Sequence, residues 1–533
     1  MIEEQVPALC ANQWYLDDGA LAGTVEELQS VIDILQIHGP ARGLYLSASK
    51  TTVWCQSSEI RAALDQVDPL SRGVSLVLED GIILLGSPIG STDFQRQANI
   101  SRIDKVREIT EKLHLMKDPQ VEFCLLRSCL SIPKIMFTLR TTNPLHHLDI
   151  WDSYDRITRE ALGRILGAPL TDIQWSQAVL PVSLGGVGLR SSTDHAAAAY
   201  ISSFLSALDL KEQILGALVS AADESSENNS TILSPELVEN LERKVGSELS
   251  VTILRSESQK ELSLKIDLQN HKLLKEKIDE IGRVRDIARI NSLSLPNAGA
   301  WLNVIPSPAL GLHLRPTEFI VSVKYRLGLD IFLTGGKCTA CPRQSDSLGD
   351  HAISCGYEGE RIARHDHIRN ALYNTCSQAC LGPTREVRDL ISGSEARPAD
   401  LFLPNWTGGQ DTALDVTVVN PLQISMIQQA ARTPGYALSK SFDRKVAKHG
   451  ELCQRAGVVF VPLPLETLGG WHETTVKEVK KIASALSRQT GANEGETICH
   501  VIQRMSILLI KGNAALLLNR RPVFPTSSTD GIE

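Results

Sequence analysis

The sequence lacks an excess of basic residues, a long apolar run and a signal-peptide pattern. Its 533 residues carry 54 Lys and Arg against 62 Asp and Glu, which gives a formal net charge of −8 and a pI near 6.0. This charge excludes a uniformly basic surface for nucleic acid, so any such binding must rest on local basic patches and metal ions. No apolar stretch is long enough to cross a bilayer without a charge, so we expect a nuclear or cytoplasmic protein without a membrane partner.

Cysteine is also sparse for a chain of this length. The eleven cysteines are odd in number and mostly scattered, which favours a reducing compartment over a secreted disulfide scaffold. The length and the apolar content of 42% are enough for several hydrophobic cores, so the chain should form more than one domain.

Four residues in the second half of the chain have the spacing of ligands for one zinc ion. They are Cys338, Cys341, His351 and Cys355. Two close pairs of this kind can surround a tetrahedral Zn²⁺. His365 and His367 follow closely and are alternatives to His351, and Asp350 is expected to hold the imidazole. The other interpretation is a group of reduced, buried cysteines.

Two aspartates downstream are expected to face each other across a hairpin. Residues 397–403 and 412–419 are strand-like, and 404–411 has the composition of a turn. A hairpin symmetric about that turn places Asp400 opposite Asp415. Facing residues have Cβ atoms about 5 Å apart, close enough for one divalent ion to bridge both carboxylates. The ion expected here is Mg²⁺.

An acid and a lysine-bearing helix flank this hairpin. Glu386 precedes it and is the third acidic candidate, and the helical pattern over 436–453 carries Lys445 and Lys448 one turn apart. An ammonium group beside a metal-bound water can stabilise the hydroxide or the charge that develops on a phosphate. Each residue alone is better explained as a solvated surface group, but the ordered set favours a nuclease.

This ordered set resembles the PD-(D/E)XK nuclease superfamily, and more closely the restriction-like endonuclease at the C-terminus of certain site-specific non-LTR retrotransposons. In that family a Cys-Cys-His-Cys knuckle precedes an Arg- or Lys-Pro-Asp signature, a second acid and a more distant lysine. The sequence departs from the pattern at Ala399, which separates Pro398 from Asp400, and at Thr417, where the wider superfamily has its lysine.

The N-terminal part resembles the end of a reverse transcriptase palm. It contains Tyr15-Leu16-Asp17-Asp18 at an expected hairpin turn, a capping box at Thr24-x-x-Glu27, the segment Ser49-Lys50-Thr51 and the turn Leu85-Gly86-Ser87-Pro88. The resemblance, which extends to about residue 470, implies that Asp17 and Asp18 are metal ligands and that Lys50 protonates pyrophosphate. The family needs a third Asp upstream and only sixteen residues precede Asp17, so we expect this chain alone to lack polymerase activity.

The expected fold is α+β and multidomain. Its parts are a partial reverse transcriptase palm (1–92), a thumb-like helical region with Lys134 and Arg140 near the groove (93–203), a linker and charged helices (204–314), a helix and zinc knuckle (315–367), an α/β restriction-like endonuclease core (368–490), and a C-terminal helix and tail (491–533).

The expected activity is Mg²⁺-dependent hydrolysis of DNA, with DNA and RNA as partners and a deoxynucleoside triphosphate as the only small-molecule substrate. Two other interpretations stay open: a catalytically inactive, zinc-containing nucleic-acid-binding protein, and a structural remnant without a partner.

Overall fold

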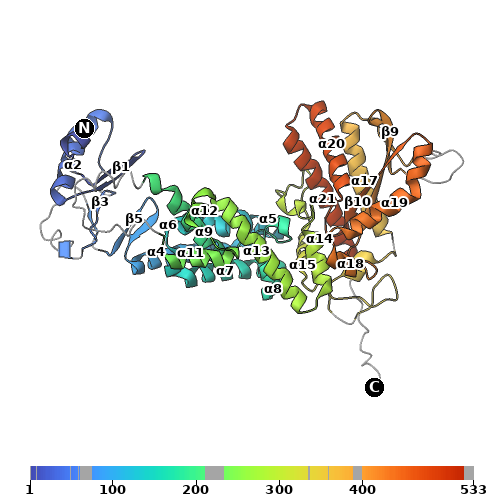
Figure 1. Ribbon diagram of the computed structural model, residues 1–533, viewed down its shortest axis with the longest axis horizontal. Helices are drawn as coiled ribbons and strands as arrows, with labels where there is room; N and C mark the ends of the chain where they lie inside the picture. The colour runs from blue at the N-terminus through green and yellow to red at the C-terminus, as the bar shows by residue number, and fades with distance from the viewer. Residues whose placement is uncertain are drawn as a thin grey trace, which may run out of the picture. The chain divides into compact units, whose positions relative to one another are not determined.

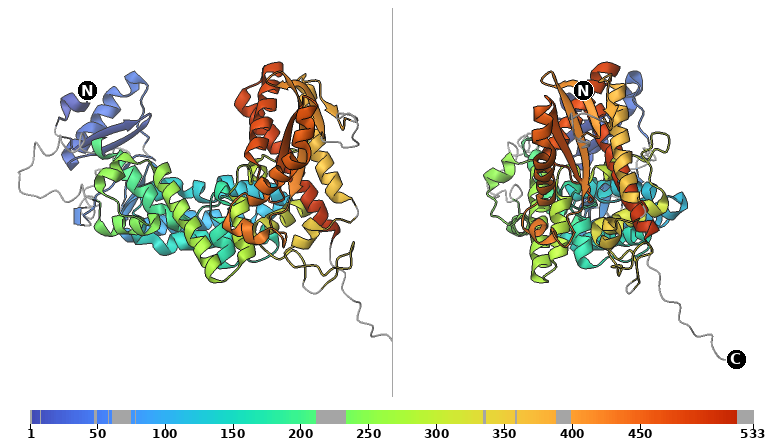
Figure 2. Two further views of the ribbon diagram at one scale, coloured as in Figure 1. Left: turned by 45° about the vertical axis from the view of Figure 1, so that its right-hand side comes forward. Right: turned by 90° about the vertical axis from the view of Figure 1, so that its right-hand side faces the viewer.

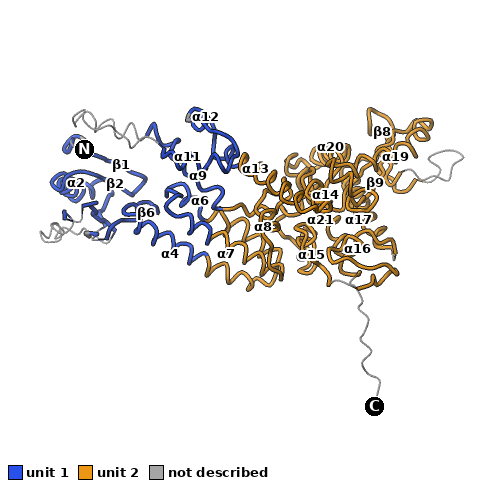
Figure 3. The backbone as a smooth tube through the Cα atoms, turned by 60° about the horizontal axis from the view of Figure 1, so that its bottom comes forward, with its two compact units in different colours: residues 1–106, 135–153, 192–263 blue, residues 107–134, 154–191, 264–533 orange. Residues whose placement is uncertain are grey.

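The computed structural model describes residues 2–7, 9–47, 50–57, 59–60, 75–77, 79–210, 233–333, 336–357, 359–387 and 399–520. Ser49, Arg397 and Pro398 lie outside these residues. The chain divides into two compact units, one of residues 1–106, 135–153 and 192–263 and one of 107–134, 154–191 and 264–533 (Figure 3). The protein is mostly helical with small sheets, which confirms the α+β class.

The N-terminal part of the first unit is built from short strand pairs and one capped helix. The strands are β1 (Ala11–Tyr15), β2 (Asp18–Ala22), β3 (Thr52–Val53), β4 (Ser75–Leu76), β5 (Gly81–Leu84) and β6 (Ser87–Gly90), and the helices are α1 (Ile2–Gln5), α2 (Val25–His38) and η1 (Pro40–Arg42). Among the described residues the six strands form three separate pairs and not one sheet. The predicted capping box of Thr24 and Glu27 is present, and α2 ends at His38 with Gly39 as its C-cap.

Helices predominate among the described residues between residue 92 and the metal knuckle. They are α4 (Thr92–Glu111), η2 (Leu113–Met116), α5 (Pro119–Leu125), the π-helical turn η3 (Leu126–Leu130), α6 (Ile132–Thr141), η4 (Pro144–His147), α7 (Leu148–Leu166), α8 (Asp172–Ala178), η5 (Val182–Leu184), α9 (Ser192–Ser206), α11 (Pro235–Val245), α12 (Val251–Ser256), α13 (Gln259–Glu280), α14 (Val284–Leu293), η7 (Ala300–Asn303) and α15 (Pro316–Leu327). The helical run within the expected thumb-like region is interrupted at Ser131, which has an extended backbone. Pro133 cannot donate a helical hydrogen bond, so a new helix begins at Ile132.

A four-stranded sheet forms the centre of the C-terminal part. Its strands are β7 (Thr384–Arg385), β8 (Leu401–Thr407), β9 (Gln410–Val419) and β10 (Val459–Glu466), in the order β10-β9-β8-β7. β7, β8 and β9 are antiparallel neighbours, while β10 runs parallel to β9. A parallel pair needs a crossover, and α19 (Tyr436–Arg455), close to the predicted helix, supplies it. The prolines of β10 are tolerated because this is an edge strand.

The turn between β8 and β9 is tighter than the sequence indicated. The strands run to Thr407 and from Gln410, so most of the segment 404–411 is strand. Gly408 and Gly409 have φ values of 61° and 80°, the left-handed conformation that a two-residue hairpin of this twist requires. An irregularity between Leu403 and Thr407 absorbs the extra residues, so the register from Leu401 to Leu403 is the predicted one.

Helices cover both faces of this sheet (Figures 1 and 2). On one face, α17 (Glu360–Gln378), α20 (Glu473–Thr490) and α21 (Glu494–Asn519) bury a core that includes Leu401, Leu414 and Leu463. On the other face, α19 packs Leu452 and Cys453 against a smaller cluster. The short helices α16 (Asp350–Ser354) and α18 (Ile427–Arg432) complete this part of the chain.

One helix among the described residues, α21, is long and apolar enough to cross a membrane by length and composition. In the protein, 67% of its most apolar window is buried, because the helix packs against α15, α17 and α20. A buried core helix satisfies the same test, so this finding is weak evidence for a membrane span.

Candidate functional site

Asp400 lies directly before β8, and Asp415 lies within β9. The pairing of Leu401 with Leu414 is the predicted register. It does not continue regularly to Asp400, whose backbone N–H donates to the carbonyl of Leu414 at 3.0 Å. The carboxylates of Asp400 and Asp415 are nevertheless close enough to interact electrostatically. The side chains of the two aspartates are only 18% and 8% exposed. Two carboxylates therefore lie at adjoining places with little access to solvent.

Lys445 on α19 is the cation that contacts Asp415. Its Nζ lies 2.8 Å from Oδ2 and 3.1 Å from Oδ1 of the carboxylate. Burial raises the pKa of Asp415 to about 6; the nearby Lys445 opposes this rise, and the charge of Asp400 adds to it. Although Lys445 is close, Oδ2 of Asp415 accepts no well-directed hydrogen bond from the described residues. This buried oxygen therefore retains capacity to bind another cation.

His365 on α17 holds Asp400 from the opposite side. Its Nε2 lies 3.0 Å from Oδ2 of Asp400 and 3.0 Å from the carbonyl of Val416, and its Nδ1 lies 3.2 Å from Asp366. The same Oδ2 accepts the backbone N–H of Val416 at 2.7 Å. The hydrogen bond to Asp400 is the main cause that raises the pKa of His365 to about 9, so the imidazole is protonated at neutral pH.

Glu386 reaches the site through its backbone, while its carboxylate has another partner. Its N–H donates to the carbonyl of Asp400 at 3.2 Å, and its φ of 47° turns the chain sharply after β7. The carboxylate forms an ion pair with Arg369 of α17. Lys448 is exposed and makes no ion pair with a described residue, so Lys445 is the lysine that the fold brings to the aspartates.

The candidates in the N-terminal part are exposed. Asp17 and Asp18 lie at the turn between β1 and β2, the predicted hairpin. Lys50 is exposed after β2 and α2, and Lys134 is exposed on α6. Arg140 donates to Oε1 of Gln259 at 2.6 and 2.8 Å.

Cys338, Cys341, His351 and Cys355 come together as the spacing predicted. One ligand atom from each residue lies within 4.8 Å of all the others, and Sγ of Cys341 is 3.2 Å from Nε2 of His351. Three sulfurs and an imidazole nitrogen at these separations are the donor set of a structural zinc site. The arrangement could hold Zn²⁺, and the histidine in it is His351 and not His365 or His367. His365 contacts Asp400 instead.

The environment of the knuckle suits metal binding. Burial lowers the pKa of His351, which keeps the ring neutral. Burial raises the pKa of Cys338, whereas at Cys355 the hydrogen bonds from the backbone of Tyr357 and from Arg520 outweigh burial and lower the pKa. A neutral imidazole and a stabilised thiolate are the protonation states that bind zinc.

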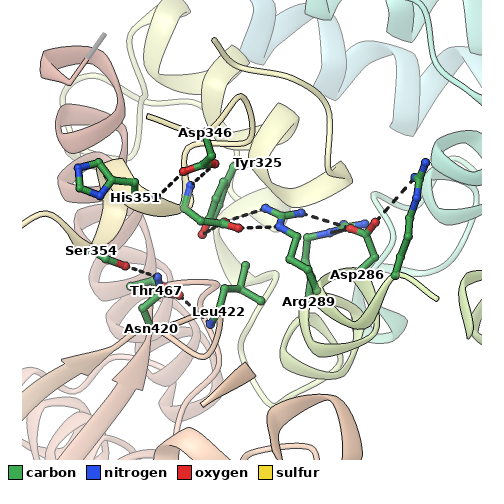
Figure 4. A network of polar contacts seen from close by, with 12 residues as sticks. Asp286, Arg289, Tyr325, Asp346, His351, Ser354, Asn420, Leu422 and Thr467 are labelled. Atoms are coloured by element: carbon green, nitrogen blue, oxygen red, sulfur yellow. Dashed lines mark hydrogen bonds and ion pairs between the residues drawn. The ribbon is translucent and has the colours of Figure 1, made fainter. Parts of the chain in front are cut away.

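The predicted role of Asp350 is wrong. Its carboxylate pairs with Arg285, at 2.7 and 2.8 Å, and accepts the hydroxyl of Tyr325 at 3.1 Å. The nearby Asp346 accepts the backbone N–H groups of Asp350 and His351, at 2.9 and 2.7 Å, and the imidazole extends away from that contact (Figure 4). Asp346 thus fixes the start of α16 and, through it, the backbone of the histidine ligand.

Asn420 connects the knuckle to the sheet. It follows β9, donates to Oγ of Ser354 on α16 at 2.7 Å, and accepts the hydroxyl of Thr467 after β10 at 3.1 Å (Figure 4). The metal knuckle is therefore bonded to the ends of two neighbouring strands, an arrangement that braces the core of this unit.

The sequence interpretation missed three contributors to these sites: His365 as the partner of Asp400, Arg369 as the partner of Glu386, and Arg520, which lowers the pKa of Cys355. All three are ordinary charged residues of helices by their local pattern. Comparison with known proteins adds no assignment, because no protein-family model matches the chain and no curated protein matches it.

Proposed function

We propose that the region 368–490 is a metal-dependent nuclease that hydrolyses DNA phosphodiesters, within a chain derived from a retrotransposon reverse transcriptase/endonuclease. The observation that carries the proposal is the pair of neighbouring buried carboxylates of Asp400 and Asp415, with Lys445 against the second. Buried charged groups are costly to a fold, and carboxylates with a strongly shifted pKa and a specific charge partner are concentrated at functional sites.

The residues present fit Mg²⁺. This ion is usually held by one or two carboxylates and keeps several waters, and Asp400 and Asp415 would be those carboxylates. The underused Oδ2 of Asp415 supports this fit, since a buried oxygen without a well-directed donor is an available ligand. When bound, Mg²⁺ would supply a water of lowered pKa and a Lewis acid for the phosphate.

The chain's own residues would orient and charge the site. His365 would keep Oδ2 of Asp400 in place from α17, together with the N–H of Val416. Lys445, 23% exposed, would place its ammonium beside the phosphate and stabilise the charge that develops there. Glu386 would act as the third acidic residue of the site only after its carboxylate separates from Arg369.

A plasmid-nicking assay with the full chain tests this function. We expect Mg²⁺ to support conversion of supercoiled to nicked DNA, and Asp400→Asn and Asp415→Asn each to slow it by about a hundredfold or more. Asp443→Asn is the control, because Asp443 is an exposed carboxylate two residues from Lys445 on the same helix. Cleavage that persists in both site variants would refute the assignment.

A second function, zinc-dependent nucleic-acid binding without cleavage, is favoured by one observation. Lys445 and Arg369 already pair with Asp415 and Glu386, so the acids are neutralised without a metal ion. This alternative predicts that the chain retains DNA or RNA equally with and without Mg²⁺ and never nicks the plasmid. For the N-terminal part we expect no incorporation of deoxynucleotides, although the order of its motifs supports descent from a palm.

A further inference from the structure

The C-terminal end of α21 lies against both halves of the metal knuckle. The hydroxyl of Thr339, which lies between the first two cysteines, donates to the carbonyl of Asn519 at 3.1 Å. Arg520 caps the helix and donates to the carbonyl of Tyr357 at 2.5 Å and to Oε1 of Glu360 at 2.8 Å. The helix end is therefore bonded to the segment between the first two ligands and to the segment after the last ligand.

Arg520 also lies beside a ligand. Its buried guanidinium is close enough to Cys355 to lower the pKa of that thiol. A zinc ion bound by three thiolates and a neutral imidazole carries one net negative charge. A guanidinium removed from solvent and placed beside one of these sulfurs compensates that charge where water cannot do so.

We propose that Arg520 is a positioning residue for zinc and that zinc binding and docking of the end of α21 stabilise each other. Contacts of this kind orient the ligand and adjust its charge, and their loss typically lowers metal affinity about 10- to 100-fold. Coupling between two binding events is reciprocal, so the metal must strengthen the helix docking by the same factor. The proposal rests on the knuckle alone and is independent of nuclease activity.

A purely structural ion pair is the competing explanation. Glu360 pairs with the guanidinium, and Asn519 donates to the same carboxylate at 3.4 Å. If this pair only fastens the helix, its removal lowers the stability of the fold and leaves the zinc affinity of the folded protein unchanged. Zinc affinity therefore separates the two explanations.

The test measures Zn²⁺ affinity of the full chain by competition with a chromophoric chelator. We expect Arg520→Met to weaken binding about 10- to 100-fold. Arg520→Lys should weaken it less, because it keeps the charge but loses the planar fork of donors. Arg504→Met is the matched control, since Arg504 is exposed on the same helix. Equal affinities of Arg520→Met and Arg504→Met would overturn the proposal.

A second measurement keeps the proposal testable if Arg520→Met does not fold. Removal of zinc from the wild-type chain should accelerate hydrogen exchange of the backbone amides at 516–520, while amides in the first turns of α21 keep their protection. Unchanged exchange at 516–520 after zinc removal would show that the helix end is not coupled to the metal.

Discussion

Asp415→Asn is expected to make the protein more stable at neutral pH. In the wild type, Asp415 is 8% exposed, and burial raises its pKa to about 6 even though Lys445 is 2.8 Å away. The folded state therefore holds the carboxyl proton more tightly than the unfolded state does. Stability from this group is fully present below the unfolded pKa and is lost as the pH rises through the folded pKa.

The magnitude follows from the two pKa values. The difference between about 6 in the folded state and about 3.9 in the unfolded state corresponds to about 3 kcal/mol, at about 1.36 kcal/mol for each tenfold change in the protonation equilibrium. Asparagine has the shape of the protonated acid and does not ionise. Because the variant also leaves Lys445 without its partner, this figure is the upper limit of the expected gain.

Urea unfolding of the full chain between pH 4 and pH 8 measures this effect. The wild type and Asp415→Asn should have similar free energies of unfolding near pH 4. The advantage of the variant should increase up to pH 6 and remain constant above it. Mg²⁺ at about a hundred times its dissociation constant should stabilise the wild type by about 2.7 kcal/mol and leave Asp415→Asn unchanged. A difference between the proteins that does not vary with pH would refute the burial argument, and Asp443→Asn serves as the exposed control.

Two further predictions concern the cations of the site. Lys445→Met should reduce plasmid nicking by about a hundredfold, as for loss of other groups that stabilise transition-state charge. Lys448→Met should leave nicking unchanged, because Lys448 is exposed and forms no ion pair with a described residue. Equal losses of nicking in both variants would contradict the placement of Lys445. His365, whose side chain is 27% exposed, has a pKa of about 9 against an ordinary value near 6.5. Below pH 6.5 the wild type should therefore exceed His365→Gln in stability by up to about 3 kcal/mol. Urea unfolding should show that this advantage disappears as the pH rises through 9.

The features of the fold that could be predicted are those set by local sequence. The pairing of Leu401 with Leu414 followed from counting outward from a turn, because the side-chain period of a strand leaves one register that buries the apolar residues. The helix over 436–455 and the capping box at Thr24 likewise follow from residues within a few positions of one another. The length of the turn was wrong because Gly408 and Gly409 alone can make it.

The partners of the site residues could not be predicted, because packing between elements decides them. His365 lies 35 residues from Asp400 in the sequence. Because it follows Cys355 closely in the sequence, it was predicted as an alternative zinc ligand. Only the placement of α17 across the sheet brings it to the aspartate. Asp350 is adjacent to His351, yet its side chain points to Arg285 on α14. Neighbours in sequence thus have different partners in space.

The charges at the aspartate site indicate how its two possible functions differ. Asp366, Asp400, Asp415 and Glu386 supply four carboxylates, while Lys445, Arg369 and the protonated His365 supply three cations. One net negative charge repels a phosphodiester, and a bound divalent ion would change the net charge to +1 and attract it. DNA binding at this place should therefore depend on Mg²⁺ if the site is a nuclease. Binding that is independent of Mg²⁺ must involve another surface, as the inactive zinc-containing protein requires.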